Sequence, residues 1–221
     1  MKTEDNSSFD DFNDGRQPAA LPGFERIHRF WDNKNNIYSA KIRPGEYYVT
    51  NHGEMISTVL GSCVAACIRD KVKKIGGMNH FMLPISDKYE SDEWLHTPVS
   101  LATRYGNVAM ERLINAILAC GGNKRNMEVK LFGGGKVLDV DTDIGKMNIE
   151  FVRGFLNKEG YEISSSDVGG SWPRKVNYYP TSGRVRVKRF YKVHNKTLVE
   201  REQKYIRELQ HMPVGGEIDL F

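Results

Sequence analysis

Cysteine is scarce in this chain, and long apolar runs are missing. Three cysteines among 221 residues are an odd and low number, which argues against the disulfide framework of a small secreted protein. The longest uncharged apolar stretch, Met55 to Ile68, contains Gly, Ser and Thr and is shorter than the roughly 20 residues needed to cross a bilayer. The N-terminus also lacks the basic and then apolar pattern of a secretory signal. We therefore expect a cytoplasmic protein with no direct insertion into a membrane.

A large net charge is lacking too, since the formal charge is only +4. Acidic residues gather in an N-terminal leader, residues 1–23, which is poor in large apolar side chains and is therefore predicted to be disordered. The rest of the chain is basic. In residues 184–189, Val alternates with Arg and Lys, which predicts a half-exposed strand with its basic side outward. That side is either a solvated face or a docking surface for an acidic partner. No nucleic-acid-binding motif accompanies the charge, so no nucleic-acid partner is expected.

What the chain does contain is a cysteine and a histidine at a spacing that lets them meet. Cys63 and His80 lie seventeen residues apart, in short apolar runs typical of buried strands. The charged segment 69–74 between the runs predicts a hairpin. If Ile68 pairs with Ile75, the register places Cys63 directly opposite His80, with Cβ atoms about 4.5–5.5 Å apart. A nucleophile and its base would then be neighbours.

This pair has the chemistry of amide hydrolysis through an acyl-enzyme. An imidazole such as that of His80 accepts the thiol proton of Cys63 and later returns it to a leaving amine. A hydroxyl from Ser57 or from Thr58 is available to orient the ring or the substrate. Gly61 lets the chain turn sharply before the nucleophile, and the backbone N–H groups there, including that of Cys63, are candidates to stabilise an oxyanion.

Two alternatives use the same residues differently. Cys63 and His80 are also compatible with an ordinary buried core, without any chemistry. Together with Cys67 they offer soft metal ligands, but in a strand Cys67 lies about 13 Å from Cys63, too far to share a tetrahedral zinc. A helix would bring the two sulfurs one turn apart and favour a metal again. On the strand interpretation, we expect neither a metal nor a cofactor.

The remaining patterns predict an α+β fold with a mixed or antiparallel sheet, because strands outnumber helices and do not alternate strictly with them. A single domain is expected over residues 24–212, followed by a flexible tail, residues 213–221. The predicted strands, besides the two of the hairpin, are residues 46–50, 127–132, 161–163, 176–179 and 184–189, the last two joined as a hairpin. The predicted helices are residues 102–119, residues 148–157 and a C-terminal helix that begins at the capping-box spacing Thr197 to Glu200.

Five motifs occur in order along the chain: Leu60-Gly61-Ser62-Cys63-Val64, Gly77-Met78-Asn79-His80-Phe81-Met82-Leu83-Pro84, Phe132-Gly133-Gly134-Gly135, Ile144-Gly145-Lys146-Met147-Asn148 and Asp167-Val168-Gly169-Gly170. Their order and spacing, over roughly residues 46–189, resemble the chemoreceptor glutamine deamidases of bacterial chemotaxis, the CheD family. The resemblance implies a cytoplasmic hydrolase that converts receptor glutamines to glutamate. It also implies a packed β-layer core with outer helices, similar to the deamidating toxin hydrolases.

The resemblance assigns roles to matching positions. Cys63 corresponds to the nucleophile, which forms a thioester, and His80 to the base and then the acid. Ser57, six residues before the cysteine, corresponds to a third polar member that is often threonine in the family; the adjacent Thr58 is the alternative. The implied partners are the cytoplasmic helical region of chemoreceptors and, in some members, a phosphatase of the response regulator. No cofactor is implied.

Two other functions fit the same residues. One is a different thiol enzyme, such as an amidase, a transglutaminase or a cysteine protease. The other is a non-catalytic adaptor that binds the receptor or the phosphatase through its basic face. Neither the receptor glutamines that serve as substrates nor the oligomeric state follows from the sequence.

Overall fold

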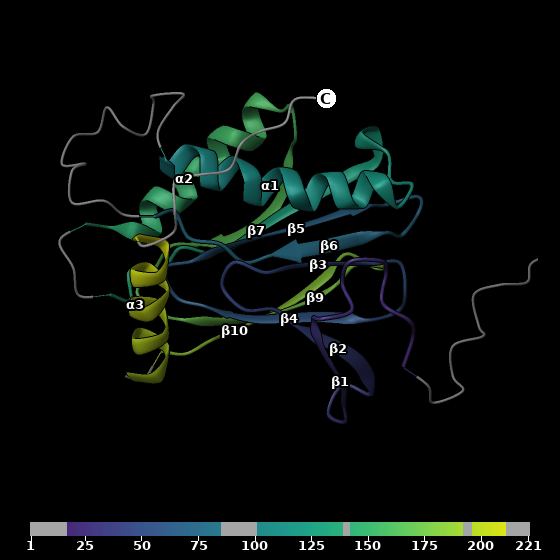
Figure 1. The fold of residues 1–221 in the computed structure, drawn as a ribbon, viewed down its shortest axis with the longest axis horizontal. Helices are drawn as coiled ribbons and strands as arrows, with labels where there is room; N and C mark the ends of the chain where they lie inside the picture. Colours follow the sequence, from purple (N-terminus) through teal and green to yellow (C-terminus); the bar gives the residue numbers. More distant parts are fainter. Residues whose placement is uncertain (1–16, 85–100, 139–141, 192–195, 211–221) are drawn as a thin grey trace, which may run out of the picture.

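The computed structural model describes residues 17–84, 101–138, 142–191 and 196–210, which form two stacked mixed sheets with helices outside them (Figure 1). One sheet has the order β1 (His28–Asp32), β2 (Ile37–Lys41), β4 (Met55–Leu60), β9 (Arg174–Tyr179) and β10 (Arg184–Arg189). The other has the order β3 (Tyr47–Thr50), β6 (Gly76–Asn79), β5 (Val64–Asp70), β7 (Met127–Gly133) and β8 (Ile163–Val168). The helices are α1 (Leu101–Ala119), α2 (Ile144–Lys158) and α3 (Lys196–Gln210), with a short 3₁₀ turn at Lys124–Asn126.

The predicted α+β class is confirmed. Within the described residues, β2 pairs with β4 and β7 with β8 in parallel, while the other strand pairs are antiparallel. Helices α1 and α2 cover the outer face of the β3-β6-β5-β7-β8 sheet, and α3 lies across one end of the two layers (Figure 1). The likeness to deamidating toxins stays a prediction.

Most predicted elements are found, with shifted ends. Helix α2 begins four residues earlier than predicted, because the side chain of Asp143 caps it by accepting a hydrogen bond from the Lys146 N–H. The β9–β10 hairpin is present, and Val185 and Val187 are half-buried between exposed basic neighbours, as predicted. The β1–β2 hairpin was not predicted from the sequence. Its turn places Asn36 at a positive φ of 51°, a conformation that asparagine tolerates.

The predicted hairpin of β5 and β6 forms, but its register is shifted by two residues. Ile68 pairs with Gly77 rather than with Ile75, and β5 continues to Asp70, whose N–H donates to the Ile75 carbonyl. The Asp70 carboxylate accepts hydrogen bonds from the N–H groups of Val72 and Lys73. This local capping of the turn stabilises a tighter connection than the six-residue segment predicted from charge.

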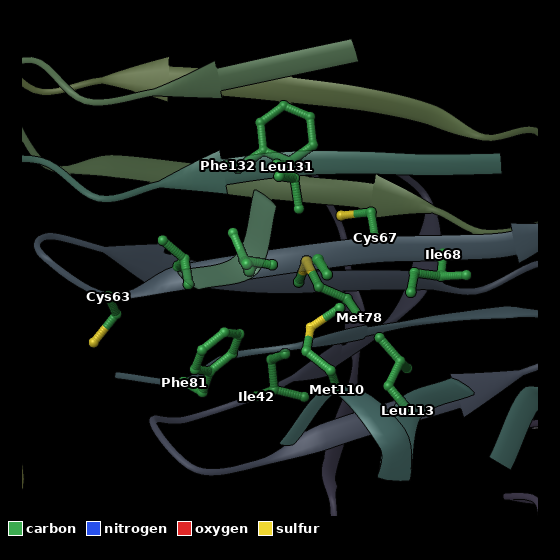
Figure 2. Close-up of a cluster of buried hydrophobic side chains, with 14 of the residues drawn as sticks. Ile42, Cys63, Cys67, Ile68, Met78, Phe81, Met110, Leu113, Leu131 and Phe132 are labelled. Atoms are coloured by element: carbon green, nitrogen blue, oxygen red, sulfur yellow. The ribbon is translucent and has the colours of Figure 1, made fainter. Parts of the chain in front are cut away.

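The core lies between the two sheets and under α1. Figure 2 shows Met78 of β6 packed with Met110 and Leu113 of α1, while Cys63 lies at the margin with its sulfur directed away from this cluster. Gly77 permits the close approach of α1, since a Cβ there would lie 2.8 Å from a methyl of Leu113. Cys63 is fully buried and belongs to this core, at its margin.

The packed chain begins before the predicted boundary at residue 24. Phe24 is buried, and Ala20 and Leu21 pack against the core. Most of the predicted acidic leader, residues 1–16, and the predicted tail, residues 213–221, lie outside the described residues. Among the helices of the described ranges, none combines the length and the apolar content that a membrane crossing requires.

Candidate active site

The candidate nucleophile lies in a short connection, Gly61–Cys63, through which the chain leaves β4 in one sheet and enters β5 in the other. All three carbonyl groups of this nucleophile loop accept hydrogen bonds from elsewhere in the chain. The donors are the Gly135 N–H to Gly61 at 2.7 Å, the Asn148 side-chain amide to Ser62 at 2.9 Å and the Gly134 N–H to Cys63 at 2.7 Å. With its carbonyls held on one side, the loop turns the N–H groups of Gly61 and Ser62 to the other side, where they bind the Glu202 side chain.

Glycine is required where the other motifs approach this loop. Gly133 has a φ of +107°, and a side chain there would collide with the Cys63 carbonyl. Gly145, at the start of α2, packs so closely on the loop that a Cβ would lie 2.5 Å from the Gly134 carbonyl oxygen. These glycines therefore let backbone pack directly against the nucleophile loop.

His80 is buried directly after β6 and is fixed by its backbone and its ring. Its N–H donates to the Glu46 carbonyl at 2.9 Å, and its own carbonyl accepts from the Gly45 N–H at 2.7 Å. Ring atom Nδ1 lies 2.7 Å from the Thr58 hydroxyl, which donates its hydrogen to the Ile42 carbonyl at 2.9 Å. Because that hydrogen is used, the hydroxyl must accept from Nδ1–H. This tautomer leaves the lone pair on Nε2.

The Nε2 atom of His80 is buried and has no hydrogen-bond partner among the described residues. Buried polar atoms are normally paired, so an unpaired ring nitrogen at this position calls for an explanation. A lone pair held in the acceptor state is the form that a general base needs.

Ser57 does not supply the orienting hydroxyl. Successive side chains of a strand point to opposite faces, so Thr58 shares the core-facing side of β4 with Ile56 and Leu60, both of which belong to the core. Ser57 lies on the other face, although its backbone carbonyl accepts a hydrogen bond from the Ile42 N–H. The expectation for Ser57 is therefore corrected: the hydroxyl that contacts His80 is that of Thr58.

Cys63 and His80 lie on the same side of the paired chain segments but are not directly opposite one another. Val64 forms a bridge with Phe81, and the two residues exchange both backbone hydrogen bonds. Cys63 and His80 each precede one member of that bridge. In an antiparallel pair this is a diagonal relation, for which Cα atoms are typically about 7–8 Å apart. The two-residue shift of the register preserves the shared face, because the side-chain period of a strand is two.

Both groups are neutral in this arrangement. Burial raises the pKa of the Cys63 thiol well above its usual range, and the negative charge and hydrogen bond of Glu202 act in the same direction. Burial lowers the pKa of His80 to about 3, and the positive charge of Arg201 contributes to the same effect. Burial therefore holds the pair in its uncharged state, and two residues of α3 add to this effect.

The lowered pKa of His80 predicts a measurable dependence of stability on pH. Below the ordinary value of 6.5 the unfolded chain binds a proton here that the folded chain does not. The contribution of His80 to stability is thus fully present above that value and is lost as the pH falls through the window toward 3. We expect the unfolding free energy of the wild type to fall more steeply there than that of His80→Gln, by up to about 1.4 kcal/mol per pH unit. Denaturant titrations at several pH values measure both slopes, and equal slopes would contradict a neutral, buried His80.

An open pocket of about 410 Å³ borders His80 and Thr58. Its remaining walls come from the chain after β2 and from α3, and four basic residues contribute to them: Lys41, Arg43, Arg201 and Lys204. The pocket therefore leads from solvent to the imidazole through a surface that favours acidic groups.

The carboxylate of Glu202, from α3, occupies the other side of the nucleophile loop. Oε1 accepts from the N–H groups of Gly61 and Ser62, both at 3.0 Å. Oε2 accepts from the Ser62 hydroxyl at 2.7 Å and from the Ser62 N–H at 3.1 Å. Two backbone N–H groups thus converge on a carboxylate oxygen beside the candidate nucleophile.

The metal alternative has no counterpart in the described part of the chain. No group of three or more His, Cys, Asp or Glu residues is placed there to hold a metal ion. Cys67 lies within β5, where it pairs with Met78, and both it and Cys63 are free thiols. The strand geometry assumed in the sequence analysis therefore holds for Cys67.

Two site residues were not identified as such from the sequence. Asn148 lies in one of the five motifs, but its role became visible only in the structure: its amide joins the Ser62 carbonyl to the Leu83 N–H. Glu202 lies 141 positions after Gly61, in a helix with an ordinary amphipathic pattern. The motif is a signal for Asn148, whereas no local signal distinguishes Glu202 from the other charges of α3.

The Thr58 contact predicts different effects for neighbouring hydroxyls. In Thr58→Val the Nδ1–H of His80 loses its buried acceptor, worth about 1–3 kcal/mol, so we expect kcat/KM for glutamine hydrolysis to fall roughly 10- to 100-fold. Thr58→Ser keeps the hydroxyl and should retain most activity. Ser57→Ala, on the opposite face, is the matched control and should behave as wild type. Steady-state ammonia release measures all three, and a larger loss in Ser57→Ala would return the role to Ser57.

Comparison with known proteins places this geometry in context. A family model described as CheD chemotactic sensory transduction matches residues 82–189. A probable chemoreceptor glutamine deamidase CheD of Halorhodospira halophila is 52% identical over 204 residues, covering 92% of this chain and 94% of that one. The protein of the same name from Hahella chejuensis is 49% identical over 204 residues, covering 92% and 95%. That from Saccharophagus degradans is 44% identical over 211 residues, covering 94% and 96%.

Proposed function

Because the chain belongs to the chemoreceptor glutamine deamidase (CheD) family, we propose that it hydrolyses glutamine side chains of chemotaxis receptors to glutamate, with Cys63 as nucleophile. One observation supports the thiol mechanism above the others. The buried Cys63 directly follows two N–H groups that converge on one carboxylate oxygen, and it shares a face of the paired segments with His80, whose Nε2 is unpaired among the described residues. A thiol, a base and an oxyanion site are the parts that acyl transfer needs.

In the proposed first step, Nε2 of His80 takes the proton from Cys63, and the thiolate attacks the amide carbon of the substrate glutamine. The carbonyl oxygen becomes an oxyanion, which the N–H groups of Gly61 and Ser62 stabilise. The C–N bond then breaks, His80 returns the proton to the departing ammonia, and a thioester remains on Cys63. Thr58 keeps the His80 ring in the tautomer that this transfer requires.

In the second step, water attacks the thioester carbon while Nε2 of His80 accepts a proton from it. The C–S bond breaks, His80 returns this proton to the Cys63 sulfur, and the glutamic acid that is formed releases its remaining proton to solvent and leaves as a carboxylate. One water is consumed and one ammonia released for each glutamine. The proposed cycle uses only side chains and backbone groups of this chain. That the enzyme needs no cofactor stays a prediction.

Charge supports an acidic surface on the receptor as the partner. The basic residues that line the pocket leading to His80 favour such a surface, as does the exposed basic side of β10. The proposed substrate region is the cytoplasmic helical part of the receptor, which requires this chain to act in the cytoplasm. A phosphatase of the response regulator is a second proposed partner, on the family resemblance alone.

The decisive test incubates the purified protein with a receptor cytoplasmic fragment and follows ammonia together with a mass-spectrometric map of the fragment. We expect ammonia release and conversion of particular glutamines to glutamate. Cleavage of the fragment would instead indicate a protease, and cross-linking would indicate a transglutaminase. Tight binding without any conversion would indicate an adaptor.

A further inference from the structure

Helix α3 is attached to the protein by apolar side chains and by one buried carboxylate. Of its described side chains, only Glu202 and Leu209 are buried, while Tyr205 and Ile206 are half-buried and the rest are exposed. A helix that serves only to complete a core is normally anchored by an apolar stripe. In α3, the carboxylate side chain of Glu202 is also buried, with only 2% of its surface exposed.

Burial of a carboxylate is costly unless its oxygens are well paired. Among the described residues, Glu202 has no salt bridge, and its partners are the N–H groups of Gly61 and Ser62 and the Ser62 hydroxyl, all directly before Cys63 in the chain. These are the groups to which the proposed mechanism assigns the oxyanion and the nucleophile. Glu202 therefore uses the reaction site itself as its binding site.

The position of Glu202 corresponds to that of the reaction product. After hydrolysis of the thioester, a glutamate carboxylate lies beside the Cys63 sulfur with one oxygen still on the oxyanion donors. Glu202 has this arrangement: Oε1 is held by the N–H groups of Gly61 and Ser62, the two residues that directly precede Cys63. Moreover, the carboxylate is presented from an α-helix, with exposed charged residues Arg201 and Lys204 nearby.

We propose that α3 fills the groove in which the substrate helix docks, and that Glu202 occupies the place of the deamidated side chain as an inhibitory product mimic. The proposal rests on the proposed function and adds to it how access to this site is controlled. The substrate is an α-helix with a mostly charged surface that presents its glutamine in the position of Glu202. It reaches Cys63 only when α3 has left the groove.

The contacts around Tyr205 define the course of the groove. Its hydroxyl contacts that of Tyr105 in α1, and a Cβ on Gly45 would lie 3.0 Å from it. From there α3 runs along the pocket that contains Thr58 and His80. A substrate helix docked along the same path covers both the nucleophile loop and the imidazole of His80. It also shields the thioester from bulk water.

The sharpest test converts the product mimic into a substrate. In Glu202→Gln the new amide is held beside Cys63 by the same N–H groups, so we expect the enzyme to hydrolyse it to glutamate and release ammonia. Peptide mapping of the purified variant should show glutamate restored at position 202, formed at a rate independent of protein concentration. The neighbouring Gln203 is exposed and should stay glutamine in the same peptide. The double variant Cys63→Ala/Glu202→Gln should retain both amides.

A second measurement addresses inhibition of the receptor reaction. Glu202→Ala should release α3 and lower the KM for a receptor fragment by about tenfold or more, since the apparent affinity scales with the open fraction. Glu200→Ala, which removes an exposed carboxylate from the same helix, is the matched control and should leave KM unchanged. An unaltered KM in Glu202→Ala would overturn the inhibitory role.

The two proposals fail in different ways. If the Glu202→Gln protein keeps its introduced amide but still converts receptor glutamines, the product-mimic proposal is overturned and the proposed function stands. If folded wild-type protein converts no receptor glutamine and Glu202→Gln also keeps its amide, the proposed function itself fails. Hydrolysis of the introduced amide that persists in the double variant would show chemistry independent of Cys63 and would overturn both.

Discussion

Replacement of Cys63 by alanine is expected to reduce receptor deamidation by roughly 10⁴- to 10⁶-fold, the loss typical of removing a covalent nucleophile. The thioester cannot form without the sulfur, and neither His80 nor the N–H groups of the nucleophile loop can replace it. The loop itself should persist, because its carbonyls are held by Gly134, Gly135 and Asn148 rather than by the thiol. The measurement is the rate of glutamine conversion in a receptor fragment, followed by mass spectrometry.

Cys120→Ser is the matched control for this prediction. Cys120 is a free, partly exposed thiol beyond α1, so its replacement tests for general effects of removing a cysteine and should leave the rate unchanged. Thermal unfolding of both variants establishes that each is folded. A Cys63→Ala protein that is folded and still converts glutamine at more than a small fraction of the wild-type rate would contradict the thiol mechanism.

Replacement of Asn148 by alanine is expected to lower both stability and activity. The side chain is fully buried, donates to the Ser62 carbonyl and accepts from the Leu83 N–H. Its loss leaves two buried backbone groups unpaired, at about 1–3 kcal/mol each, so we expect the unfolding free energy to fall by about 2–6 kcal/mol. Denaturant titration measures this loss.

The same change should also reduce catalysis, because the nucleophile loop loses one of its three anchors. A displaced loop no longer aims the N–H groups of Gly61 and Ser62, and the loss of one oxyanion donor typically lowers kcat by about 10²- to 10³-fold. Asn157→Ala is the matched control, since Asn157 is exposed on the same helix. Full kcat in folded Asn148→Ala would show that the other two anchors suffice to position the loop.

Residue patterns close in sequence were enough to propose a nucleophile and a base. The glycines around Cys63, the interval to His80 and the apolar runs that contain both define a hairpin without tertiary information. The predicted register of the β5–β6 hairpin was wrong by two residues. Cys63 and His80 still share a face, because a shift by two residues keeps each side chain on its side of the sheet. The sequence did not reveal that the Asp70 carboxylate closes the turn early, since that depends on side-chain hydrogen bonds.

The choice between Ser57 and Thr58 shows a limit of sequence reasoning. Both hydroxyls precede Cys63 by similar intervals, and the strand that carries them was recognised. Which one faces His80 depends on how the sheet containing β4 packs against the sheet containing β6. Only the stacking of the two sheets decides this, by turning the Thr58 side of β4 toward the core.

Short-range sequence patterns thus determined most secondary structure, the reactive cysteine and its histidine, because propensity, periodicity and turn chemistry act over a few residues. Tertiary structure alone decided three matters: which hydroxyl orients the ring, how Asn148 anchors the nucleophile loop, and that Glu202 occupies the reaction site. Each depends on contacts between segments distant in sequence, up to 141 positions for Glu202 and Gly61. Such contacts depend on how the whole domain packs. They produce no periodic pattern in the sequence near the residues involved, so local patterns cannot predict them.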